Sequence, residues 1–109
     1  MNFHISVSDA MEQLAKENEE RFTLLMQYGT MRIAYYAPKD VDPQMPHAQD
    51  EIYVIASGYA KFFRDGQRVQ CKTGDVLFVP AKMVHRFENF SDDFATWVIF
   101  YGPEGGEVK

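Results

Sequence analysis

The chain has 109 residues, which suits one domain with a workable hydrophobic core and leaves little room for a second. Its net charge of −5 comes without a basic cluster, which argues against nucleic acid as a partner, and no apolar run approaches the roughly 20 residues of a membrane span. The N-terminus does not look like a secretory signal, and the single cysteine, Cys71, excludes an intramolecular disulfide. We therefore expect a soluble cytoplasmic protein that binds neither nucleic acid nor membrane.

The first expected element is a short helix that starts near Ser8. Ser8 is placed to cap exposed amides, and Asp9 and Glu12 suit the positive end of the helix dipole. A narrow apolar stripe follows at helical spacing: Ala10, Met11, Leu14 and Ala15. We expect a surface helix that lies on a larger body and ends near the acidic residues 17–20.

Beyond Arg21 the sequence becomes rich in aromatic, β-branched and large apolar residues, which favours strands. Residues 22–28 and 30–36 predict two strands, or one strand bent at Gly29. Residues 37–46 contain three prolines, which suit neither a central strand nor the interior of a helix. This stretch is therefore expected to be a stiff loop that leads directly into His47.

The rest of the chain alternates short apolar runs with turn signals. We expect strands at residues 51–56, 59–64, 67–72, 76–79, 85–90 and 94–101, with Asp65-Gly66 as a strong hairpin turn. The last of these runs is apolar almost throughout, as expected for a strand covered on both faces. Many short strands with turns between them predict an all-β sandwich or barrel.

Four residues ahead of and inside the third expected strand fall at alternate positions: Met45, His47, Gln49 and Glu51. They would share one face of a strand if no bulge intervenes. Imidazole nitrogens and carboxylate oxygens both coordinate divalent metals, so this face is a candidate metal site. The spacing alone is weak evidence, because a lone histidine on a strand is more often a hydrogen-bonded structural residue.

The wider spacing resembles that of the cupin superfamily. The first cupin motif is a histidine, one residue, a second histidine, three or four residues, a glutamate, six residues and a glycine. His47, Glu51 and Gly58 match its second half. The spacings of the second motif are met by four residues: Gly74, Pro80, His85 and Asn89. The resemblance covers roughly residues 30–101.

This resemblance implies a single cupin-type jelly-roll β-barrel with a short N-terminal helix. Its core would cover about residues 22–101, with a helical extension at residues 1–21 and a tail at residues 102–109. The family also implies a frequent homodimer. Because edge strands need covering, residues 22–36 are the expected contact.

Two positions depart from the family pattern: Met45 stands in the slot of the leading histidine, and Lys82 in that of an inner glycine. Full matches bind a metal through three histidines and the glutamate, and this chain keeps three of those four ligands: His47, Glu51 and His85. Gln49 could supply an oxygen in the fourth place, or water could fill it. A second register, with Gln49 in the slot of the second histidine, would shift the glutamate spacing, so we prefer the first.

The resemblance implies one divalent ion, which could be iron, zinc, manganese or nickel, and a small-molecule substrate or ligand. Cupins built in this way include dioxygenases and isomerases, and the sequence does not identify catalytic residues beyond the metal ligands. The alternative is a non-catalytic module that binds a small molecule beside a degenerate metal site. Met45 favours this alternative, because a thioether is a poor ligand for such ions. A third hypothesis is a purely structural domain, for which we expect a collapsed barrel without a cavity.

Overall fold

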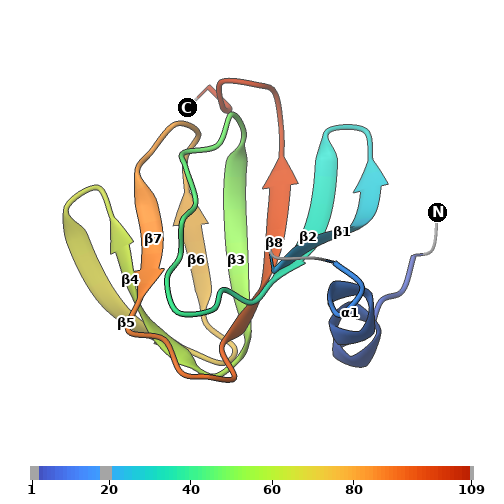
Figure 1. The fold of residues 1–109 in the computed structure, drawn as a ribbon. Coiled ribbons are helices and arrows are strands. Elements are labelled where there is room, and N and C mark those ends of the chain that lie inside the picture. Colours follow the sequence, from blue (N-terminus) through green and yellow to red (C-terminus); the bar gives the residue numbers. More distant parts are fainter. Residues whose placement is uncertain (1–2, 18–20, 109) are drawn as a thin grey trace.

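The computed structural model describes residues 3–17 and 21–108, and in these residues it contains one helix and eight strands (Figure 1). The elements in chain order are α1 (Val7–Leu14), β1 (Phe22–Tyr28), β2 (Met31–Tyr36), β3 (Asp50–Ser57), β4 (Tyr59–Arg64), β5 (Gln67–Lys72), β6 (Val76–Val79), β7 (His85–Glu88) and β8 (Ala95–Tyr101). None of the described helices is long and apolar enough to cross a membrane.

The strands form two antiparallel sheets that face each other (Figure 1). The larger sheet has the order β1-β2-β8-β3-β6, and the smaller one has the order β5-β4-β7. Strands that are neighbours in a sheet are often distant in sequence, as β2 and β8 are, which is typical of a jelly roll. The predicted all-β jelly roll is confirmed, with the two sheets remaining separate rather than closing into one continuous ladder.

The core between the sheets is built mainly from aromatic side chains. Tyr53 from the large sheet meets Phe87 and Phe62 from the small sheet, with ring centroids 4.9 Å and 5.8 Å away. Phe94 packs on Phe87 at 4.8 Å. Each fully buried side chain of this size stabilises the fold by about 1.5–3 kcal/mol, so this cluster fixes the spacing of the two sheets.

One row of inward-facing residues crosses the large sheet and reaches the site described below. Arg32 on β2 pairs with Phe100 on β8, which pairs with Glu51 on β3, which in turn pairs with Val79 on β6. Residues directly opposite each other on neighbouring strands point to the same face. Phe100, Glu51 and Val79 are buried, so this row faces the interior.

The helix begins earlier than predicted, because Ser6 rather than Ser8 is its N-cap. The Ser6 hydroxyl accepts a hydrogen bond from the Asp9 amide, and the Asp9 carboxylate accepts one from the Ser6 amide. This reciprocal pair of hydrogen bonds, a capping box, stabilises a helix that starts at Ser6 rather than at Ser8. The helix ends at Leu14, ahead of the predicted acidic end, of which residues 18–20 lie outside the described part of the chain.

The helix and β8 show how the outer face of the large sheet is covered. Ala10 and Leu14 of α1 are buried against Tyr35 and neighbouring residues, whereas Met11 of the predicted stripe is exposed. On the outer side of β8 Ala95 is buried, but Trp97, Ile99 and Tyr101 are only half-buried. The prediction that β8 is covered on both faces is therefore wrong for its outer face, which the helix covers only in part.

Candidate metal centre

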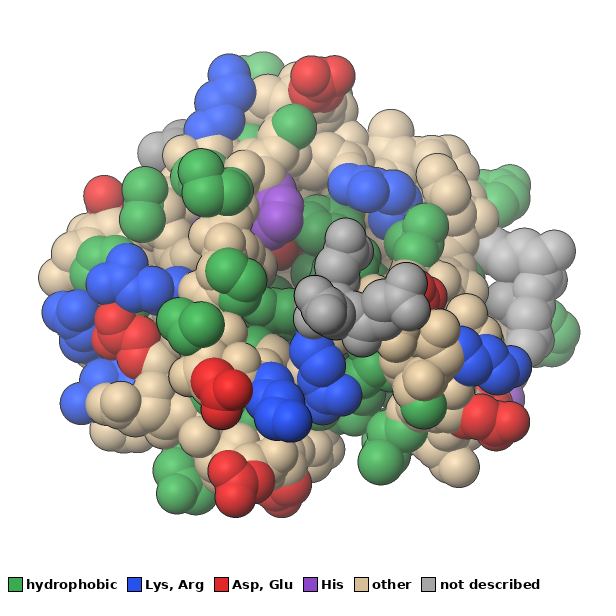
Figure 2. Space-filling model, viewed as in Figure 1, with side chains coloured by type: hydrophobic (Ala, Val, Ile, Leu, Met, Phe, Trp, Pro, Cys, Tyr) green, Lys and Arg blue, Asp and Glu red, His purple; other side chains and the backbone are tan. Residues whose placement is uncertain are grey.

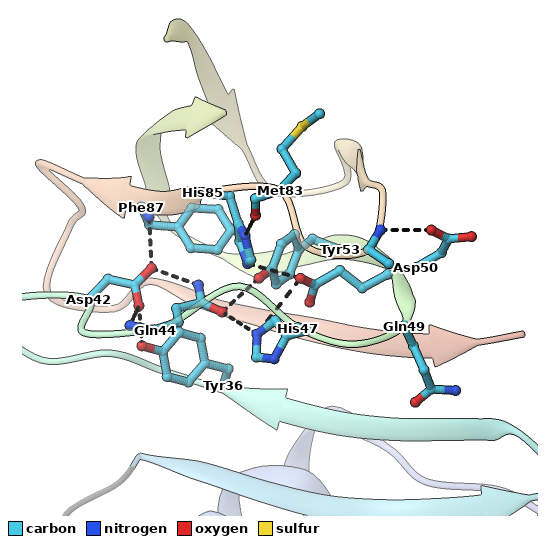
Figure 3. A network of polar contacts seen from close by, with 12 residues as sticks. Tyr36, Asp42, Gln44, His47, Gln49, Asp50, Tyr53, Met83, His85 and Phe87 are labelled. Carbon is cyan, nitrogen blue, oxygen red and sulfur yellow. Dashed lines mark hydrogen bonds and ion pairs between the residues drawn. The ribbon is translucent and has the colours of Figure 1, made fainter. Parts of the chain in front are cut away.

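The structure brings three of the four predicted ligands together between the two sheets. His47 lies in the loop before β3, Glu51 lies on β3 in the large sheet, and His85 begins β7 in the small sheet (Figure 3). His85 Nε2 is 2.9 Å from Glu51 Oε1, and His47 Nε2 is 3.8 Å from the same oxygen. One ligand atom from each residue lies within 4.8 Å of the other two.

Backbone contacts orient both histidines toward Glu51. His85 Nδ1 is 2.8 Å from the carbonyl oxygen of Met83, so in the neutral imidazole Nδ1 carries the proton and Nε2 presents a lone pair. The Lys82 amide donates to the His47 carbonyl at 2.7 Å. Lys82 has a φ of 69°, a left-handed conformation that suits the glycine usual at this family position. The turn before β7 thus holds the loop that carries His47.

The polar atoms of this cluster fit a divalent cation. Both carboxylate oxygens of Glu51 and Nε2 of His85 are buried and make no aligned hydrogen bond within the described residues, although the His85–Glu51 contact is short. Glu51 is only 1% exposed. A buried carboxylate without an aligned hydrogen bond is costly, and a metal ion bound by its oxygens and the imidazole lone pairs would remove that cost.

The two histidines differ in their affinity for protons. Burial lowers the pKa of His85, but the Glu51 carboxylate and the Met83 carbonyl outweigh burial, and the net pKa is raised. Burial also lowers the pKa of His47; Glu51 opposes this, the charges of His85 and Arg32 add to it, and the net pKa is lowered. A proton bound to the cluster is therefore held mainly at His85, facing Glu51.

Gln49, the fourth predicted ligand, is not brought to the cluster. The regular strand begins only at Asp50, so the alternation expected from Met45 onward does not hold. The Gln49 amide nitrogen donates to the carbonyl oxygens of Thr30 and Gly102, each at 2.9 Å, and its oxygen accepts from Arg32. Figure 3 shows its side chain pointing away from the histidines, and Met45 is 74% exposed.

Gln44 lies beside His47, a contact that the sequence did not predict. Its side-chain oxygen lies 3.2 Å from His47 Nε2 and accepts a hydrogen bond from the Tyr53 hydroxyl at 2.9 Å. Asp42 holds Gln44 in this position by accepting from its backbone amide and its side-chain nitrogen. The signal in the sequence was Asp42-Pro43-Gln44, because an aspartate often accepts from the amide two residues further on.

The cluster is reached from outside through the side on which His47 lies. The His47 side chain is 30% exposed, whereas that of His85 is fully buried. Figure 2 shows a hollow on this face with a histidine on its wall and acidic and hydrophobic side chains inside. The buried ring of Phe100 packs beside His47, with its centroid 5.1 Å from that of His47. His47 is therefore the member of the cluster that is open to solvent.

The comparisons with known proteins agree with this architecture. The model of the cupin domain matches residues 32–101. Uncharacterized protein SCO3923 of Streptomyces coelicolor is 33% identical over 98 residues, which are 88% of this chain and 93% of the relative.

Two solved structures share the fold. A cupin 2 conserved barrel domain protein from Salinispora arenicola has 20% identity and a TM-score of 0.68, and the match covers 94% of this chain and 89% of that one. A protein of unknown function from Rhizobium leguminosarum has 18% identity and a TM-score of 0.73, covering 93% and 97% of the two chains. With the family model matching most of its length, this chain belongs to the cupin family.

Proposed function

We propose that this protein is a metal-dependent cupin that acts on a small molecule, with one divalent ion held by His47, Glu51 and His85. Iron, zinc, manganese and nickel all accept this set of donors. The observation that carries the proposal is the group of buried atoms without aligned hydrogen bonds around Glu51. Within the described residues, no lysine or arginine lies near enough to Glu51 to neutralise it as an ion pair.

An ion in this place would act as a Lewis acid that polarises a substrate oxygen. Three protein donors leave a coordination position open to substrate or water. The protein contributes the fixed tautomer of His85, the negative charge of Glu51 and the aromatic rings of Tyr53 and Phe62 beside His85. Dioxygenase and isomerase chemistry are both compatible with such a centre.

A second candidate, a non-catalytic binding module, is favoured by Gln44. Its side-chain oxygen already provides His47 Nε2 with a hydrogen-bond partner, as expected for a site that works without metal. Binding of candidate small molecules in excess chelator separates the two functions. Affinity that survives complete removal of metal supports the module, and affinity that disappears with the metal supports the metal-dependent protein.

Metal content tests the proposed function. Purified protein reconstituted in turn with each of the four metals and then desalted should keep close to one equivalent of at least one of them. The double variant His47→Ala, His85→Ala should keep almost none, and Gln49→Ala, which lies outside the cluster, should behave as wild type. A wild-type protein that retains no metal, or a double variant with full occupancy, contradicts the proposal.

We also propose that the protein is a homodimer that associates through β1 and β2. β1 is an edge strand of the large sheet, and the outer face beside it carries half-buried apolar residues such as Met26 and Ile33. Light scattering should give twice the mass of one chain, and Met26→Lys should shift the protein toward the monomer. Val69→Lys on the small sheet serves as the control. A monomeric wild type contradicts this proposal.

A further inference from the structure

We infer that Arg32 forms an anion-binding subsite beside the metal centre, and that the substrate carries a carboxylate or phosphate group that this arginine binds. The inference rests on the proposed metal-dependent function and specifies the chemistry of its substrate. It is carried by the position of Arg32, by the contacts that hold it and by its lack of a carboxylate partner.

The position of Arg32 follows from the row that crosses the large sheet. Arg32 pairs with Phe100, and Phe100 pairs with Glu51, so Arg32 and the metal-binding carboxylate face the same interior with one strand between them. Two strand spacings place their Cα atoms about 10 Å apart. The inward residues that follow on β2, Ala34 and Tyr36, are buried in the core. Arg32 is therefore the first of the inward-facing residues of β2, and it lies close to the candidate metal centre.

Two neutral groups fix the side chain of Arg32. Its guanidinium carbon lies 4.5 Å from the centroid of the Phe100 ring, whose other neighbour is the ring of His47. Nε and Nη2 of Arg32 donate to the Gln49 side-chain oxygen at 3.1 Å and 2.7 Å. The Gln49 amide cannot turn over, because its nitrogen donates to two backbone carbonyls. Gln49 thus positions the arginine rather than a metal.

The charge of Arg32 has no carboxylate partner within the described residues. Two other arginines, Arg68 and Arg86, also stack on an aromatic ring, that of Phe63, but both form ion pairs with Glu88. A guanidinium has five N–H groups, and Gln49 takes only two of those of Arg32. The remaining fork matches the paired oxygens of a carboxylate or a phosphate.

The charges around the centre also favour an anion. Glu51 is negative, and the buried Asp42 is a second acidic residue nearby, but Asp42 already accepts four hydrogen bonds. A divalent ion together with Arg32 would leave the pocket with a positive balance, although the whole chain has a net charge of −5. A small anion can then place one oxygen toward the metal and its charged group on Arg32.

The test uses zinc-loaded protein and three small anions: malonate, succinate and inorganic phosphate. Binding is followed by shifts of backbone amide signals in NMR spectra, with succinamide as the uncharged counterpart of succinate. The variants are Arg32→Gln, Arg32→Lys and the matched control Arg68→Gln, each checked for folding by circular dichroism and for zinc affinity. The same titrations on metal-free protein separate the contribution of the arginine from that of zinc.

We expect at least one anion to bind wild type and Arg68→Gln alike, and to bind Arg32→Gln roughly 10- to 100-fold more weakly. Arg32→Lys, which keeps the charge but not the fork, should fall between them. Preference for succinate or for phosphate identifies the anionic group. The inference is overturned if no anion binds zinc-loaded wild type, if succinamide binds as well as succinate, or if Arg32→Gln binds like wild type. The proposed function fails separately, if the protein retains none of the four metals, and the metal-free titrations still judge Arg32.

Discussion

Asp42 is the residue on which the conformation of the site loop depends most. Its two oxygens accept from the Tyr36 hydroxyl, the Phe87 amide and two nitrogens of Gln44, so every partner is a donor. An asparagine would turn an NH₂ group toward some of these donors. We expect Asp42→Asn to lower the free energy of unfolding by about 1–3 kcal/mol in urea titrations. The exposed Asp92→Asn is the control, and equal stability of the two variants would show that Asp42 is not needed.

Metal affinity should depend on pH mainly through His85. Its raised pKa means that a proton occupies the imidazole at a higher pH than in an ordinary histidine, and metal must displace that proton. His47, with a lowered pKa, stays neutral over the same range. Competition with a zinc-binding dye between about pH 8 and pH 6 should show affinity falling, with a midpoint above the usual value of about 6.5. A flat profile, or a midpoint below that value, contradicts this assignment.

Among single residues, the sequence predicted the candidate metal ligands, because their spacing along the chain can be read directly from the motifs. His47, Glu51 and His85 fall in the positions that the two family motifs require, and the fold brings them together. Gln49 was expected at the metal site and Gln44 was not considered, because the direction of a side chain in an irregular loop depends on hydrogen bonds with distant residues. Gln49 is held by carbonyls of Thr30 and Gly102, which no local pattern reveals.

Gly58, in the turn between β3 and β4, has no room for a side chain. It has a φ of 74°, and a Cβ atom there would lie 2.9 Å from the Cα of Phe94 and would collide with the Ser91 hydroxyl. Gly66, in the β4–β5 hairpin, has a φ of 85° but open space around it. Gly66→Ala should cost about 1–2 kcal/mol from backbone strain alone, and Gly58→Ala about 1–3 kcal/mol more. Chemical denaturation of both variants measures the difference, and equal losses would rule out the steric part.

The helix offers a similar comparison between two serines. Ser6 caps α1 and Ser8 does not, although the sequence favoured Ser8. We expect Ser6→Ala to lower the unfolding free energy by about 1 kcal/mol and Ser8→Ala to have little effect. Thermal denaturation followed by circular dichroism gives both values. A larger loss of stability in Ser8→Ala than in Ser6→Ala would show that Ser8 is the cap.

Element boundaries were predictable where turn chemistry marks them. Asp65-Gly66 and Gly74 bound β4, β5 and β6 almost as expected, because these residues adopt left-handed φ angles that end strands. The stretch before β3 was harder, since alternating residues resemble a strand even where prolines and Asp42 hold the chain in a loop. Local pattern cannot weigh such tertiary contacts.

At the scale of the whole molecule, the two sheets place the donor atoms. β3 carries Glu51 in the large sheet and β7 carries His85 in the small sheet, with an aromatic core that sets the distance between them. The order of strands, such as β8 between β2 and β3, pairs segments that are far apart in sequence. Composition and periodicity predicted an all-β fold but contain no information on this order; only the resemblance to cupins implied it.

The proposed metal centre can be tested directly by diffraction from crystals grown with each candidate metal, measured at that metal's absorption edge. We expect one anomalous peak within bonding distance of His47, Glu51 and His85, with Gln49 still bound to Arg32 away from it. No peak at this cluster for any of the metals, or a peak bound elsewhere in the chain, would contradict it.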